Sequence, residues 1–216
     1  PGFLRGLAPA GPGEFVVTTS GGQVSRYRPA DGESEVLADN FDQLYGVAIA
    51  ADGTIAAAEL GTGRVVSIRS GRVEVIASGL ADPIGVAIAP DGGWLVSEAG
   101  AGRVVTLTGS GPKTVAAEFD RPQGILVDKN QLYVIDAGAK ALVAVDLSDG
   151  SRCTIASGLP LGAAPGVVPK PLKGMPPFSG PQGPFAGITA GPDGTLYVSA
   201  DADGSVLAFR HGGRDG

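Results

Sequence analysis

The stretch DPIGVAIAPDGGWLVSEAGAGRVVTL, residues 82–107, decides the fold that this sequence predicts. It contains three short runs rich in Val, Ile and Leu, and Pro, Asp and Gly bound each run. This punctuation is typical of antiparallel strands joined by tight turns. The same cadence returns at residues 46–68, 124–145 and 187–209, which indicates a repeat protein.

A glycine opens the first strand of each repeat, and these residues are Gly6, Gly46, Gly85, Gly124 and Gly187. The first four lie about 40 residues apart, the period of a four-stranded propeller blade. The last interval is longer because of a proline-rich insertion at residues 161–182. The sequence therefore predicts an all-β fold, a β-propeller with about five four-stranded blades visible, in which residues 1–216 form a single domain.

Ring closure is the open question of this fold. The fifth repeat ends near Arg210, which leaves no room for its outer strand. Propellers close their ring to remove exposed strand edges. We therefore expect a missing N-terminal piece or a second polypeptide to complete the ring, in preference to a self-sufficient ring of five blades.

Composition excludes some functions. The net charge of −6, with scattered Lys and Arg, argues against a nucleic-acid partner. No apolar stretch approaches the length of a membrane span, so no membrane partner is expected. The only cysteine, Cys153, lies in the strand-like context SRCTIASG and is expected to be buried and inert. The sequence favours no particular cellular compartment.

The run P-x-G-V-A-x-x-P-D-G-x-x-x-V-x-(E/D)-x-x-x-x-R-V resembles the NHL repeat. Its best matches are residues 82–107, 121–145 and 187–209. Beyond that repeat, the chain resembles the six-bladed group that contains gluconolactonase-like hydrolases and virginiamycin B lyase-like enzymes. The resemblance implies a six-bladed ring when complete, with a site at the mouth of the central channel.

In the gluconolactonase-like family, residues just before the strand-opening glycines hold a divalent metal through Glu, Asn and Asp. The corresponding residues here are Arg5, Tyr45, Ile84, Gln123 and Ala186. Only Gln123 offers a side-chain carbonyl, so no metal site is predicted within these repeats. A Ca²⁺ or Mg²⁺ cofactor would need ligands from outside this chain. The histidine base of the lyase-like branch also lacks a counterpart in any repeat.

Acidic residues end the second strand of most repeats, and they are Glu59, Glu98, Asp136 and, displaced by one position, Asp201. They are the candidate catalytic residues, because a ring of carboxylates could bind a cation or supply a general base. The favoured interpretation is structural, since Asp and Glu at such positions cap the following turn by accepting backbone hydrogen bonds.

Two functions stay open on these grounds. The first is a lactonase-like hydrolase or lyase acting on a small molecule beneath the 161–182 insertion, with a second chain completing the site. The alternative is a non-catalytic NHL-type propeller that binds a protein or small ligand on the same face. The candidate ligand-contacting residues are Tyr45, Gln123, Met175, Phe178 and Phe185.

Overall fold

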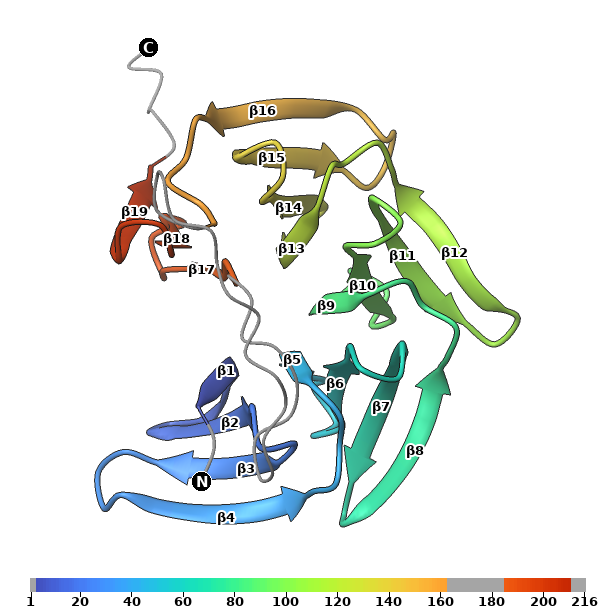
Figure 1. Ribbon diagram of the computed structural model, residues 1–216, viewed down its shortest axis with the longest axis vertical. Coiled ribbons are helices and arrows are strands. Elements are labelled where there is room, and N and C mark those ends of the chain that lie inside the picture. The colour runs from blue at the N-terminus through green and yellow to red at the C-terminus, as the bar shows by residue number, and fades with distance from the viewer. Residues whose placement is uncertain (1–2, 163–184, 211–216) are drawn as a thin grey trace.

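A computed structural model describes residues 3–162 and 185–210. In these residues the chain forms nineteen strands. The same residues contain no helix that could span a membrane. The strands build five antiparallel sheets arranged around a common axis as the blades of a propeller (Figure 1). The predicted all-β propeller fold with five visible blades is confirmed.

The blades follow one another in chain order. Blade 1 contains β1 (Leu4–Gly11), β2 (Glu14–Thr19), β3 (Val24–Arg28) and β4 (Glu33–Ala38). Blade 2 contains β5 (Leu44–Ile49), β6 (Ile55–Glu59), β7 (Arg64–Arg69) and β8 (Arg72–Ala77). Blade 3 contains β9 (Pro83–Ile88), β10 (Trp94–Glu98), β11 (Arg103–Thr108) and β12 (Gly111–Ala116). Blade 4 contains β13 (Pro122–Asp128), β14 (Gln131–Asp136), β15 (Ala141–Asp146) and β16 (Arg152–Ser157). Blade 5 contains β17 (Ile188–Ala190), β18 (Leu196–Ala200) and β19 (Ser205–Phe209).

Each blade is a simple meander, because every strand pairs with the next one in the sequence. The first strand of each blade lies nearest the axis, and the fourth strand of blades 1–4 lies at the rim (Figure 1). The core lies between neighbouring blades, where apolar side chains from two sheets pack face to face. Leu95 of blade 3 and Leu132 of blade 4 belong to one such cluster, and both are buried.

The outer strands are far more exposed than the others, and this overturns one expectation. Cys153, on β16, is exposed, so the prediction of a buried thiol is wrong. The strand assignment was correct, but β16 has a paired strand on one edge only and lies at the rim, where the blades diverge (Figure 1). An apolar strand pattern therefore does not bury a side chain at this position.

The described ring is open on one side. The innermost strands pack in succession from β1 to β5, β9, β13 and β17. Between blade 5 and blade 1 the two sheets stand apart, on the left of Figure 1.

Candidate functional site

A β-bulge shapes the start of the innermost strand in blades 1–4. In blade 3, Pro83 pairs with Glu98 and Val86 with Val96, so Ile84 and Gly85 together oppose the single residue Ser97. The same register shift recurs in β1, β5 and β13. Such bulges bend a strand and redirect its side chains. Here each bulge contains the strand-opening glycine and the residue before it.

The glycine of the bulge is required by close approach of the neighbouring blade. A Cβ added to Gly85 would lie 2.3 Å from the carbonyl oxygen of Gln123, in blade 4. Contacts this short do not occur for real Cβ atoms, so any larger residue would push the blades apart. The repeat glycines therefore bring the residues before them together around the channel.

Three of the residues around the channel mouth form a cation–aromatic cluster. The guanidinium carbon of Arg5 lies 4.3 Å from the centroid of the Tyr45 ring. The Tyr45 ring meets the Phe185 ring edge-on, with 5.5 Å between centroids and 63° between planes. Ile84 and Ala99 are buried against the same aromatic residues. The predicted ligand contacts Tyr45 and Phe185 are thus brought together, although 140 positions separate them in the sequence.

Arg5 is the most unusual member of this cluster. Its Nε, Nη1 and Nη2 atoms are all buried, and none has a hydrogen-bond partner among the described residues. Burying a charged group without hydrogen bonds is unfavourable. Stacking on Tyr45 compensates for part of this, but it uses the flat face of the guanidinium and leaves the N–H donors in its plane unused. This position would stabilise a bound anion.

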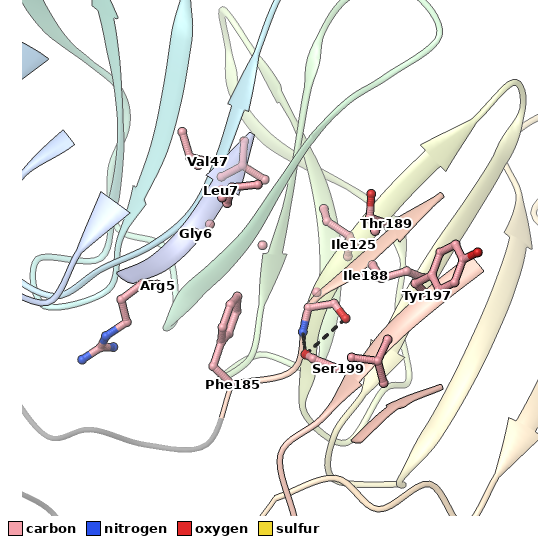
Figure 2. Close-up of a pocket in the computed structure, with 16 residues that line it drawn as sticks. Arg5, Gly6, Leu7, Val47, Ile125, Phe185, Ile188, Thr189, Tyr197 and Ser199 are labelled. Carbon is pink, nitrogen blue, oxygen red and sulfur yellow. Dashed lines mark hydrogen bonds between the residues drawn. The ribbon is translucent and has the colours of Figure 1, made fainter. Parts of the chain in front are cut away.

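A cavity of about 520 Å³ lies beside this cluster. The five strand-opening glycines line it along the axis, and its side-chain walls include Leu7, Val47, Ile125 and Tyr197. Figure 2 shows Arg5 and Phe185 at one end and Tyr197 on the opposite side, with the Arg5 guanidinium directed away from the other labelled residues. The volume is typical of small-molecule sites. Leu7 belongs to blade 1 and Tyr197 to blade 5, so residues of the first and the last blade line the same cavity.

The Gln123 side chain makes a hydrogen bond that links two parts of the ring. The residue is 4% exposed, and its Oε1 atom accepts a hydrogen bond of 2.9 Å from the backbone N–H of Ala186. This bond joins blade 4 to the residue that precedes blade 5. Contact between Gln123 and a ligand stays a prediction.

The acidic residues that end the second strands accept hydrogen bonds from backbone N–H groups, and Glu59 and Glu98 also bind an arginine side chain. None of these acidic residues lines the cavity. Glu98 is 1% exposed, and its Oε1 accepts from Ala81 N at 2.8 Å while its Oε2 accepts from Arg103 Nε at 2.6 Å. Glu59 makes the equivalent bonds to Asp42 N and Arg64.

Asp136 and Asp201 act in the same way. Asp136 accepts from the backbone N–H groups of Asp120 and Arg121, at 2.8 Å each. Asp201, on the surface, accepts from Gly162 N at 2.8 Å. The carboxylates of Glu59, Glu98 and Asp136 mainly hold the loop that precedes their own blade, whereas a role in the following turn was expected. Only Asp136 also accepts from that turn, from Ala139 N at 3.2 Å.

The described residues do not fit a divalent metal. Among the described residues, no three His, Cys, Asp or Glu side chains are grouped so that they could hold a metal ion. The positions expected to face such an ion carry a guanidinium in Arg5 and apolar groups in Ile84 and Ala186. Met175, Phe178 and nearly all of the 161–182 insertion lie outside the described residues.

No protein-family model matches the sequence, and no curated protein matches it. Solved structures share its fold. Virginiamycin B lyase from Staphylococcus aureus is 17% identical, with a TM-score of 0.65 over 96% of this chain and 69% of that chain. A chain of the nidogen/laminin complex is 19% identical, with a TM-score of 0.75 over 96% and 75%. A gluconolactonase from Xanthomonas campestris is 21% identical, with a TM-score of 0.70 over 96% and 75%.

These likenesses confirm the propeller resemblance that the repeats indicated, at the level of fold. Two of the three structures are named as enzymes, and the third is a complex between proteins. The fold is therefore compatible with both catalysis and binding. The choice between them depends on the side chains at the channel mouth.

Proposed function

We propose that the channel mouth binds a small organic molecule carrying a carboxylate or a similar anionic group. The observation that carries this proposal is the Arg5 guanidinium, whose three nitrogens are buried without partners among the described residues. A guanidinium presents its N–H donors in a plane that matches the two oxygens of a carboxylate. An anion bound beside the Arg5 guanidinium would accept hydrogen bonds from these donors and neutralise the charge.

The surroundings of Arg5 suit the rest of such a molecule. Phe185 and Val47 line the same cavity as Arg5, and the Tyr45 ring stacks on the guanidinium. Apolar and aromatic walls with a few polar groups are typical of small-molecule sites. The ligand class is therefore an amphipathic anion, with its charged end at Arg5 and its apolar body in the channel.

The test compares phenylacetate with phenylacetamide, which has the same shape and no charge. Titration calorimetry on the whole chain should show tighter binding of phenylacetate. The expected difference is about tenfold to a hundredfold, because hydrogen bonds to charged groups contribute about 1.5–3 kcal/mol. Arg5→Met keeps an unbranched side chain of similar length but removes the charge, and it should abolish the difference.

Arg72→Met is the matched control. Arg72 lies on the outer strand β8, with its side chain 81% exposed and paired with Glu74. This variant should bind phenylacetate as the wild type does. Equal affinity of the wild type for phenylacetate and phenylacetamide would refute the proposal.

A second candidate function is turnover of such a molecule by a lactonase-like hydrolase or a lyase. Fold likeness to a gluconolactonase and to virginiamycin B lyase favours it. Arg5 also suits the hydrolase, since water opens a lactone ring to a hydroxy acid whose carboxylate could bind the guanidinium. The general base, and the ligands of any Ca²⁺ or Mg²⁺, would have to come from residues outside the described part or from a second polypeptide.

Dihydrocoumarin, an aromatic lactone, tests the hydrolase form of this candidate. Acid release would be followed by pH-stat titration, with and without added Ca²⁺ or Mg²⁺. Hydrolysis above the rate in buffer, reduced in Arg5→Met, would support an enzyme. Binding of phenylacetate without hydrolysis of the lactone would favour the non-catalytic propeller.

A further inference from the structure

We propose that the cavity between blades 4 and 5 is a separate ligand site, which takes a small neutral aromatic molecule with a hydrogen-bond acceptor and holds it beside the thiol of Cys153. Blades 4 and 5 are neighbours in the ring (Figure 1). The cavity between them shares no lining residue with the cavity at Arg5. The proposal therefore does not depend on the ligand of Arg5.

The cavity has the size and the walls for one aromatic ring. Its volume is about 270 Å³. Blade 4 contributes Tyr133, Ala144 and Ile155. Blade 5 contributes Leu196 and Phe209, which pair with each other across β18 and β19. An apolar cavity of about 150 Å³ is enough to bind benzene, so a ring with one substituent fits here.

Tyr133 supplies the polar group of the site. The residue is 3% exposed and lines the cavity. Its hydroxyl has no hydrogen-bond partner among the described residues, although the hydroxyl of a buried tyrosine usually has one. Burial raises the pKa of Tyr133, and the charges of Asp128 and Cys153 raise it further. The hydroxyl is therefore a protonated donor at neutral pH, and a ligand acceptor in the cavity would complete its hydrogen bond.

The charged groups around the cavity have partners of their own. Hydrogen bonds from Thr195 lower the pKa of Asp193, and the positive charge of Arg210, which lines the cavity, adds to this effect. Gln131, also in the wall, donates from Nε2 to Asp146 Oδ2 at 2.7 Å. No charge in this set is left to attract an ion, so a neutral ligand is favoured.

The row of side chains that forms the blade 4 wall differs from its copies in the other blades. Tyr133 stands three residues before the end of β14, and it pairs with Ala144, which pairs with Cys153. The rows at the same position are Val16, Arg26 and Glu35 in blade 1, Ala56, Ser67 and Glu74 in blade 2, and Leu95, Thr106 and Lys113 in blade 3. These rows carry a polar side chain on the third strand and a charge on the rim strand.

Blade 4 has a methyl group and a thiol at these two positions. Ala144 has the smallest of the four third-strand side chains, so it leaves room between the Tyr133 ring and Cys153. Cys153 is exposed and also lines the cavity, so a molecule inside can reach its sulfur. The repeat therefore departs from its pattern in the residues that open this cavity and place a thiol beside it.

Cys153 allows the site to be tested by covalent capture. The probe is phenyl vinyl ketone, whose ring would occupy the cavity and whose carbonyl oxygen would accept from the Tyr133 hydroxyl. The sulfur bonds to the terminal carbon of the C=C group, the π bond breaks, and the thiol proton ends on the carbon next to the carbonyl. No leaving group or further reactant is needed.

The experiment measures labelling rates on the full chain by intact mass spectrometry. The chain has one Cys, and Cys153→Ser gives the background from other side chains. Methyl vinyl ketone carries the same reactive group without the ring. Each rate is divided by the rate with methyl methanethiosulfonate, a small thiol reagent without ring or carbonyl, which corrects for differences in thiol reactivity.

Glu74→Cys in the Cys153→Ser background is the matched control. It places a thiol at the same position of the blade 2 row, where the Glu74 side chain is 55% exposed. We expect phenyl vinyl ketone to label Cys153 about tenfold faster than the thiol at position 74, because the ring is buried in the cavity. Methyl vinyl ketone should show a difference of about twofold or less, since it buries no ring.

Two variants test the cavity itself. Tyr133→Phe keeps the ring and removes the hydroxyl, and it should slow labelling by phenyl vinyl ketone about twofold to tenfold. Ala144→Leu fills the space beside Tyr133 and should reduce the rate to that at position 74. The fluorescence of Trp94 on heating shows whether each variant is folded. Should Ala144→Leu fail to fold, Tyr133→Phe decides alone.

Two results would overturn the proposal. The first is an equal corrected rate of phenyl vinyl ketone at positions 153 and 74 in folded chains. The second is a faster rate at Cys153 that persists unchanged in the folded variants, since the cavity would then play no part. Arg5→Met should leave the labelling of Cys153 unchanged, so failure of the Arg5 proposal is distinguishable from failure of this one.

Discussion

Replacing Glu98 by Ala separates a structural carboxylate from a catalytic one. Glu98 is 1% exposed and binds both Ala81 N and Arg103 Nε. In the variant, the N–H of Ala81 loses its acceptor and Arg103 loses its counter-ion. If the carboxylate holds the loop before β9, the main effect is on stability.

The magnitude follows from the burial of the two partners. Breaking a buried ion pair by removing one partner destabilises a protein by about 3–5 kcal/mol. The Arg103 side chain is 37% exposed and can regain water, so the lower value applies, about 3 kcal/mol. In a domain of this size, 1 kcal/mol shifts the melting temperature by about 2–4 °C, which gives a fall of about 6–12 °C.

Tryptophan fluorescence is the natural assay, because the chain has one Trp and Trp94 lies on the same strand as Glu98. Asp201→Ala is the control, since Asp201 is a surface residue that accepts from Gly162 N. It should lower the free energy of unfolding by about 1 kcal/mol or less. A Glu98→Ala melting temperature within 2 °C of the wild type, with loss of ligand turnover, would refute the structural role.

Two further predictions concern the strand-opening glycines and the turns. Gly85→Ala should destabilise the isolated chain by about 1–3 kcal/mol through the clash with Gln123, whereas Gly187→Ala should leave its melting temperature unchanged. Backbone and side-chain hydrogen bonds from Thr195 lower the pKa of Asp193. The stabilisation from Asp193 is therefore present above about pH 4, the unfolded value, and is lost as pH falls through the lower folded value. The difference in urea midpoint between wild type and Asp193→Asn should be larger at pH 7 than at pH 3, and a constant difference would contradict it.

The strands were predictable because their signals are local. Four of the glycines, Gly6, Gly46, Gly85 and Gly124, each receive a carbonyl oxygen from the next blade, and this steric need fixes their period in the sequence. Alternating apolar residues then place four strands between successive glycines. The exposure of Cys153 was not predictable from its strand-like context, since exposure depends on the distance of its strand from the axis.

The site was only partly predictable, because its contacts join distant segments. Tyr45 and Phe185 were expected to contact a ligand, but the Arg5 stack on Tyr45 was missed. The bulges of β1 and β5 place Arg5 and Tyr45 side by side, and Arg5 was considered only as a metal-ligand position. The bond from Ala186 N to Gln123 Oε1 spans 63 positions, and no local pattern indicates it.

The meander order of the blades has a consequence for synthesis on the ribosome. Blades 1–4 are each built from four consecutive strands, so no sheet waits for a distant segment. Translation at 5–20 residues per second delivers one repeat in about 2–8 s, whereas hairpins form in microseconds. Each sheet can therefore assemble as its rim strand leaves the exit tunnel. It is then held as a half-covered layer until the next repeat packs on its exposed face, so that the ring grows in the direction of translation.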